Sequence, residues 1–407
     1  MSQPSLRFVH AGDLHLEQPL GGIAELPEHL RELFVEAPFL AAEQVFETAL
    51  AENADALFLS GDVANLELAG PRAMVFLSKQ FQRLADHDIA VYWAGGNTDP
   101  PDAWPASVEL PENVHIFPVG RVQQIEHQRS GQTVARIQGV SRRQGDRLDD
   151  SGFHRDVQGL FTVGVAHGTA AAPGAEGDRV HYMALGGSHH RQTVDQSPGV
   201  AHYSGSPQGR CPQEPGPHGC TVVMVDDTGQ VKLRFVPTDV IRWLSETVEI
   251  TAGTDHESLL RLLQARIEKL QAKHPEQNLL VSWRIQGHGT LLYHLRAGGV
   301  SDLMTAQLRE QYAAAAPGVW TVDIQCNAPL EVPAPWYDQK NIRGDLLRQF
   351  RELETDGEIP LELAAFLPEA FRDGPFTELA EVTDQDRGEL LLAASKLGID
   401  LMDGDDL

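Results

Sequence analysis

The sequence predicts an α/β protein, and three observations lead to that prediction. Short apolar runs that end in small and polar residues recur from about residue 6 to residue 238, namely LRFVHAGD, ALFLSGD, IAVYWAGGN, FTVGVAHG and HYMALGG. Such runs are typical of buried strands that lead into loops. The segment PFLAAEQVFETALAENAD, with apolar residues at helical spacing, separates the first two runs, and this alternation favours a layered α/β architecture. Later, CTVVMVDDTGQVKLRFVPT predicts a hairpin that completes a sheet.

Length and composition set the limits of the prediction. At about 150 residues per domain, 407 residues suffice for two or three domains. No run approaches the roughly 18 unbroken apolar residues that a membrane span needs, and the segment MSQPSLRFVHAGD lacks the apolar region of a secretory signal. Three cysteines without a CxxC pair argue against a disulfide framework or a cysteine zinc site. We therefore expect a cytoplasmic protein.

Three regions are expected along the chain, at 1–238, 239–335 and 336–407. The first holds the strand runs described above. In the second, the stretches TVEI, NLLVSWRIQG, LLYHLRAG and WTVDIQC predict strands, with amphipathic helices around 255–273 and 301–315. The order β-α-β-β-α-β predicts a smaller α+β capping domain. The Pro-rich segment EVPAPWYDQK predicts a linker, after which the text becomes helical and acidic.

The charge is strongly negative and unevenly placed. Lys and Arg total 32 against 58 Asp and Glu, a net charge of −26. Residues 352–407 contain 16 acids and 3 bases, so their net −13 is half of the total. Such a chain repels polyphosphate unless metal ions or local basic patches intervene. Arg142, Arg143 and Arg147 form the densest basic patch in the first region. Two interpretations of this patch remain: a solvated surface and a contact with a DNA backbone.

Residues of metal-ligand type follow several of the predicted strands. Polar residues at the carboxyl ends of strands are the usual site positions in α/β folds. Carboxylate, amide and imidazole donors together suit Mn²⁺, Fe²⁺ or Zn²⁺, and a shared Asp can bridge two cations about 3.5–4 Å apart for in-line attack on a phosphate ester. A lone D-x-H or G-D is common by chance, so the signal lies in the whole set. Its members are Asp13, His15, Asp62, Asn97, His167, His189 and His190.

The motif set resembles the calcineurin-like metallophosphoesterases, whose pattern is D-x-H, G-D-x-x-(D/N), G-N-H-(D/E), a His, and G-H-x-H. Within that superfamily the chain is similar to the SbcD/YhaO-type DNA repair exonuclease family. The closer match rests on FVHAGDLHL, YMALGGSHHRQ, YSGSPQGR and FVPTDVIRW. The resemblance implies a four-layer αββα metallophosphoesterase sandwich followed by the capping domain. It also implies two divalent metals, most often Mn²⁺, that serve phosphodiester hydrolysis.

Carried over by position, the resemblance implies two metal sites that share Asp62. Asp13, His15, Asp62 and His189 would hold the first metal, and Asp62, Asn97 and His167 the second. Two positions depart from the family. Thr98 replaces the histidine that helps to protonate the leaving oxygen, and Gly187 replaces a histidine ligand of the second metal. We expect a weak or empty second site and slow chemistry, since losing a general acid costs about 10²–10⁴-fold.

The resemblance also implies partners. The family works on DNA with an SbcC-type coiled-coil ATPase that docks on a C-terminal helix, and homodimers occur in it. Here the stripe Leu346, Phe350 and Leu353 on a helix at 342–353 is the candidate docking surface, with packing on its own domain as the alternative. Two further functions stay open beside the DNA exonuclease. One is a phosphoesterase that acts on nucleotides or small phosphoesters, and the other is a catalytically impaired metal-binding scaffold for the ATPase.

Restoring the family pattern is expected to raise turnover. The double substitution Thr98→His and Gly187→His would return an acid and a ligand to the site, so manganese-dependent hydrolysis of DNA should increase over the unmodified chain. The measurement is the rate of nucleotide release from linear duplex and single-stranded DNA. An unchanged rate would mean that the loops themselves have diverged from the family.

Overall fold

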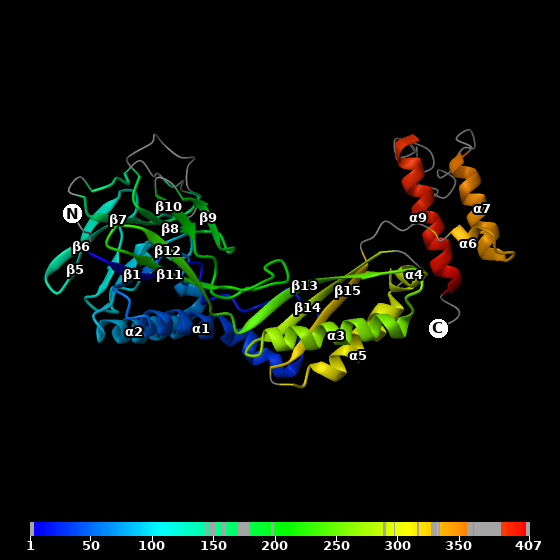
Figure 1. Cartoon of the computed structure of the whole chain (residues 1–407), viewed down its shortest axis with the longest axis horizontal. Helices are drawn as coiled ribbons and strands as arrows, with labels where there is room; N and C mark the ends of the chain where they lie inside the picture. Colours follow the sequence, from blue (N-terminus) through cyan, green and yellow to red (C-terminus); the bar gives the residue numbers. More distant parts are fainter. Residues whose placement is uncertain are drawn as a thin grey trace. The chain divides into compact units, whose positions relative to one another are not determined.

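The structure is a computed structural model that divides into two compact units (Figure 1). One unit comprises Met1–Glu246, Gln264–Trp283 and Ala306–Asp323, and the other comprises Thr247–Leu263, Arg284–Thr305 and Ile324–Leu407. The residues described are 4–143, 145, 148, 152–156, 159–169, 179–196, 199–287, 290–296, 298–315, 317–326, 332, 334–355, 361 and 384–403. Arg147 and much of the predicted acidic tail therefore lie outside the described residues.

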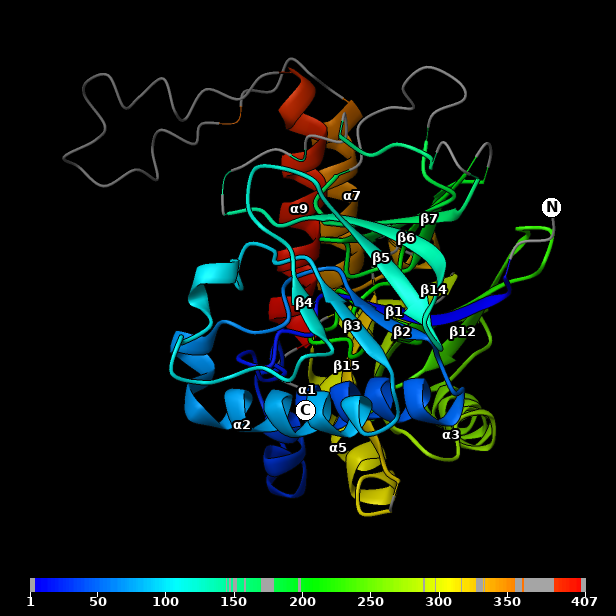
Figure 2. The same ribbon diagram turned by 90° about the vertical axis from the view of Figure 1, so that its left-hand side faces the viewer.

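The first large sheet has six strands in the order β12-β11-β1-β2-β3-β4. Strands β1 to β4 run parallel, and β11 and β12 form an antiparallel hairpin beside β1. Two helices, α1 (Glu28–Ala51) and α2 (Leu66–Ala85), lie along one face of this sheet (Figure 2). The strands are β1 (Leu6–Ala11), β2 (Ala56–Leu59), β3 (Ala90–Trp93), β4 (Val114–Ile116), β11 (Gly219–Val225) and β12 (Val231–Pro237), and a short 3-10 helix, η1 (Pro101–Ala103), follows β3.

The second large sheet also has six strands, in the order β5-β6-β7-β8-β10-β9. Its central strands β6, β7, β8 and β10 are parallel, and an antiparallel strand lies at each edge. Phe153 and Val180 pack with Met183 and Leu185 in a separate hydrophobic cluster of this sheet. The strands are β5 (Gln123–Arg129), β6 (Gln132–Val140), β7 (Phe161–His167), β8 (Tyr182–Gly186), β9 (Gln192–Asp195) and β10 (Val200–Tyr203).

Alternating side chains along the strands explain why the sheets stack. Phe8, Phe58 and Tyr92 point into a core that they share with Val163 and Tyr182 of the second sheet. Their neighbours along the same strands belong to a different core, which includes apolar residues of α1 and α2. Because both faces are buried, these strands are nearly continuous apolar runs. The mixed α/β sandwich of two large sheets is confirmed. Of the four layers that the resemblance implies, the helical layer on the first sheet is present, and no helix is found among the described residues between β5 and β10.

A third sheet, ordered β13-β14-β15, follows the sandwich in the chain. Its strands are β13 (Ile241–Ile250), β14 (Asn278–Gly287) and β15 (Val319–Cys326), and helices α3 (His256–Lys273) and α5 (Gly299–Tyr312) lie on one face of it (Figure 1). The prediction of a strand at LLYHLRAG is wrong, because α4 (Thr290–Arg296) occupies this stretch. Leu291 and Leu295 are buried at the i, i+4 spacing of a helix, which overrides the strand-like composition.

The last described elements are α6 (Ala334–Tyr337), α7 (Ile342–Thr355) and α9 (Asp384–Asp403). Helices α7 and α9 lie side by side (Figure 1). A Cβ atom at Gly398 of α9 would lie 2.8 Å from Leu346 and 4.0 Å from Phe350, so two residues of the predicted docking stripe face α9. Within the described part of the chain, no helix combines the length and apolar character needed to cross a membrane.

An ion pair at the sandwich's end is expected to matter for stability. Arg242 donates to Asp239 through Nε and Nη2, each at 2.6 Å, and the two side chains are 6% and 0% exposed. Asp239→Ala leaves a buried, unpaired guanidinium and should lower the free energy of unfolding by about 3–5 kcal/mol. Denaturant unfolding monitored by circular dichroism tests this. The exposed Asp227, replaced in the same way, is the control and should change little.

Candidate metal centre

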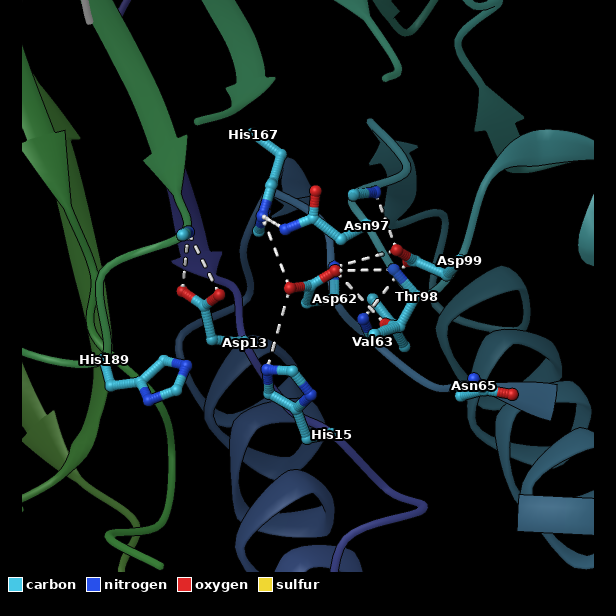
Figure 3. A network of polar contacts seen from close by, with 12 residues as sticks. Asp13, His15, Asp62, Val63, Asn65, Asn97, Thr98, Asp99, His167 and His189 are labelled. Atoms are coloured by element: carbon cyan, nitrogen blue, oxygen red, sulfur yellow. Dashed lines mark hydrogen bonds and ion pairs between the residues drawn. The ribbon is translucent and has the colours of Figure 1, made fainter. Parts of the chain in front are cut away.

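The sequence-predicted ligands converge where strands of both large sheets end (Figure 3). The loops after β1 and β2 are joined by backbone hydrogen bonds, from the Asp13 N–H to the Gly61 carbonyl (2.9 Å) and from the His15 N–H to the Asp62 carbonyl (3.0 Å). The other ligands follow β3, end β7 and follow β8. Parallel strands bring their carboxyl ends to one edge, which explains the convergence. The residues so gathered are Asp13, His15, Asp62, Asn97, His167 and His189.

Two groups of donor atoms form within this set. Donor atoms of Asp13, His15 and His189 all lie within 4.8 Å of one another, and the same holds for Asp13, Asp62 and His167. The Asp62 Oδ2 atom is 3.7 Å from His15 Nε2 and 3.3 Å from His167 Nε2, between the two groups as a bridging ligand would be. Asp13 belongs to both groups, whereas the resemblance implied that it would hold the first metal alone.

Asn97 and Thr98 approach the second group from the loop after β3. The Asn97 Nδ2 atom is 3.4 Å from His167 Nε2, and ligation through the amide oxygen requires the amide to be turned over. Thr98 donates its N–H and its hydroxyl to Asp62 Oδ1, at 2.9 Å and 3.2 Å. Thr98 therefore orients the shared carboxylate, and its hydroxyl is already engaged there.

Gly187 is an exposed residue beside the second group, whose three members are buried. Its N–H donates to both carboxylate oxygens of Asp13, at 3.0 Å and 2.9 Å. A Cβ atom at this position would lie 3.2 Å from His167 Nε2, and the backbone has φ +95°. A side chain here would face the second group, but an L-residue at such a φ is strained. Gly187→His thus requires the loop to shift, and Thr98→His is the less demanding half of the double substitution proposed above. His190 is exposed, with its ring 6.2 Å from that of His218.

Each histidine of the centre has its Nδ1 atom in a hydrogen bond. His15 donates to Glu17 (3.0 Å), His189 donates to Glu214 (2.6 Å), and His167 donates to the carbonyl of Ser60 (2.9 Å). These bonds orient the three rings and leave Nε2 of His15 without a hydrogen-bond partner among the described residues. Nε2 of His167 lies 3.3 Å from Asp62 Oδ2, whereas Nε2 of His189 lies 2.9 Å from Arg210 Nη2, which has to move before a metal can bind to His189 there. None of these hydrogen-bond partners was predicted from the sequence. Glu17 stands two residues after His15, so a local motif that includes both residues could have predicted their contact. No local pattern connects Glu214 with His189.

Asp99, also missed, holds the loops that carry Asp62 and Asn97. It is 4% exposed and accepts four N–H groups, from Asp62 (2.8 Å), Val63 (3.1 Å), Gly96 (2.7 Å) and the Trp93 indole (2.7 Å). Burial raises the pKa of Asp99 to about 7, against the effect of these donors. Asp99 follows Asn97 by two positions in GGNTD. The family motif G-N-H-(D/E) has an acid at the same place, and this acid could have identified Asp99 as a site residue.

Backbone strain and electrostatics fit a cation at this centre. Asp13, His15 and Asp62 all have positive φ, at 54°, 46° and 52°, and such strain gathers at functional sites. His15 Nε2 is buried and has no hydrogen-bond partner among the described residues. Burial raises the pKa of Asp13, opposed in part by His167. Burial also acts on Asp62, but His167 and the Thr98 N–H outweigh it, so the pKa of Asp62 lies below its usual value.

Comparisons with known proteins agree with this geometry. Residues 6–169 match the model of the family described as calcineurin-like phosphoesterase. Over 331 residues, the chain is 28% identical to the uncharacterized metallophosphoesterase YhaO of Bacillus subtilis (strain 168), an alignment that covers 77% of this chain and 80% of the relative. The chain is thus similar to metallophosphoesterases, and it contains candidate metal-binding residues. Manganese and a role in DNA repair stay predictions.

Asp99→Asn is expected to weaken the centre. An amide has one acceptor oxygen, so two of the four N–H groups would face an NH₂ group, and the free energy of unfolding should fall by about 3 kcal/mol. Mn²⁺ affinity should fall with it, because Asp62 loses its support. Chemical denaturation and calorimetric Mn²⁺ titration measure the two effects. Asp102→Asn, at an exposed residue of the same loop, is the control. Unchanged stability would contradict the anchoring role of Asp99.

Proposed function

We propose that this chain is a metal-dependent phosphodiesterase that acts as a DNA exonuclease subunit of the SbcD/YhaO type in DNA repair. The observation that carries the proposal is the convergence of two donor groups on Asp13 and Asp62 at the strand ends. The match to the calcineurin-like phosphoesterase family over residues 6–169 supports the reaction class. The motifs shared with SbcD/YhaO-type exonucleases support DNA as the substrate.

The donor set suits two divalent cations, with Mn²⁺ preferred on the sequence resemblance. Bound there, such cations would supply Lewis-acid activation of water and of a phosphate oxygen for in-line attack. Asp62 holds its carboxylate between the two groups, with Thr98 fixing Oδ1. Asp13 is fixed by the Gly187 N–H. These residues keep the donor atoms in place before a substrate arrives, which lowers the reorganisation that the reaction requires.

The candidate site lacks a residue at position 98 that can protonate the leaving oxygen. Thr98 cannot act as an acid near neutral pH, and its hydroxyl donates to Asp62. The proton must then come from water, so we expect turnover about 10²–10⁴-fold below that of an enzyme with histidine at this position. The same substitution, together with Gly187, is what favours the scaffold alternative.

One basic residue supports a phosphodiester chain as substrate. The N–H of Arg142 donates to the Gly95 carbonyl (3.0 Å), and Arg142 Nη1 is 2.6 Å from the position that a Cβ atom of Gly168 would occupy. Arg142 thus lies beside the loops that carry Asn97 and His167, where a phosphate next to the reacting one would pass. The net charge of −26 favours small phosphoesters instead, because these need no long basic track.

For the ATPase partner we propose a contact on the α7–α9 pair. Leu346 and Phe350 face α9, so they stabilise the pair and are not the docking residues themselves. Ile342 is 77% exposed, and Leu390 and Leu392 are 37% and 41% exposed, which leaves apolar side chains for a partner helix.

Asp62→Asn is expected to abolish manganese-dependent hydrolysis, because it removes charge from the carboxylate between both donor groups. Rates are measured on linear duplex DNA, single-stranded DNA, a nucleotide and bis(p-nitrophenyl) phosphate, with Asp227→Asn as the matched control. Loss of DNA hydrolysis in Asp62→Asn alone supports the exonuclease. Hydrolysis of the small esters without DNA cleavage would favour the small-phosphoester alternative, and no hydrolysis of any substrate would favour the scaffold.

A further inference from the structure

The hydrogen bonds behind the three histidines differ in charge. In the first donor group, His15 and His189 each donate Nδ1–H to a carboxylate, that of Glu17 and that of Glu214. In the second group, His167 donates to a neutral backbone carbonyl, that of Ser60. A carboxylate partner makes an imidazole a better metal ligand than a carbonyl partner does, because its negative charge stabilises the metal-bound ring.

Both carboxylates are fixed before any ligand binds. Glu17 uses one oxygen for His15 and the other for the N–H of Asn65 at 2.9 Å, and its side chain is 7% exposed. Glu214 uses one oxygen for His189 and the other for the N–H of Arg210 at 2.8 Å, and its side chain is 11% exposed. Neither glutamate has to give up freedom when a metal binds, so their effect on affinity is not offset by ordering.

We propose that Glu17 and Glu214 are positioning residues that make the group of Asp13, His15 and His189 the high-affinity metal site. The group around His167 is then the low-affinity site, and the chain binds two divalent cations with unequal strength. This inference rests on the proposed function, since it requires that both groups bind metal. Gly187 adds to the inequality, because it contributes no side-chain donor at a position where a Cβ atom would lie 3.2 Å from His167 Nε2.

The two glutamates should not contribute equally. The Arg210 guanidinium lies against His189, with Nη2 2.6 Å from Nδ1 and 2.9 Å from Nε2, and its positive charge opposes metal binding there. Glu214 is 3.5 Å from the same guanidinium, so part of its charge offsets Arg210. Among the interactions described for Glu17, none is with a positively charged arginine or lysine side chain. Removing the charge of Glu17 is therefore the cleaner test.

The experiment is a calorimetric titration of the metal-stripped full chain with Mn²⁺. The unmodified chain should show a tight and a weak binding event. Glu17→Gln should weaken the tight event by about 10–100-fold and leave the weak event unchanged. Asn97→Ala should weaken the weak binding event and leave the tight event unchanged. Glu109→Gln, at an exposed glutamate, is the matched control and should change neither event. Thermal unfolding of each variant without metal confirms that it is folded.

The outcomes separate this inference from the function on which it rests. If the unmodified chain binds no Mn²⁺, the proposed function falls and this inference falls with it. If it binds two Mn²⁺ ions and Glu17→Gln leaves the tight event as it was, only this inference is overturned. Equal weakening of both events by Glu17→Gln also overturns it. Should Glu17→Gln fail to fold, Glu214→Gln applies the same criteria to His189, with a smaller expected shift of the tight event.

Discussion

The carboxylate of Asp99 is the constraint on which the centre depends. It accepts N–H groups from Asp62, Val63, Gly96 and Trp93, which come from β3 and the loops after β2 and β3. A single buried anion thereby fixes the turn that carries Asp62 and the turn that carries Asn97 and Thr98. Strain at Asp62, with φ 52°, persists because these bonds over-determine the loop. Hydrogen bonds within the protein thus hold the Asp62 loop in place without a metal.

The strands were predictable from their apolar runs, and the candidate ligands were found because they stand within a few residues of the ends of these runs. His167 ends β7 and Asp62 lies just past β2, so a local pattern contains both the strand and its functional residue. Glu214 was not predictable, since it reaches His189 through a fold contact across 25 positions of the chain. The error at LLYHLRAG has another cause, because short apolar runs satisfy both strand and helix patterns and only packing decides between them.

The order of the strands was likewise beyond the sequence. Nothing in the local sequence of β10 determines that it lies between β8 and β9, and nothing in that of β11 determines that it pairs with β1 as well as with its chain neighbour β12. The β1–β11 pairing joins strands that are far apart in the chain, and no local pattern specifies it. The local sequence therefore predicts which residues are candidate ligands, and long-range contacts of the fold decide which of them lie close together.

The two positions that depart from the predicted motif pattern contact the two carboxylates at the middle of the centre. Thr98 donates to Asp62, and the Gly187 N–H donates to Asp13, which belongs to both donor groups. At both positions the residue present holds a candidate ligand in place. In the first donor group, both histidines donate a hydrogen bond to a glutamate carboxylate. Gly187 orients Asp13 through its backbone N–H, and Thr98 orients Asp62 through its N–H and its hydroxyl, so both residues are compatible with a metal held by these carboxylates, whereas neither supplies an imidazole for proton transfer.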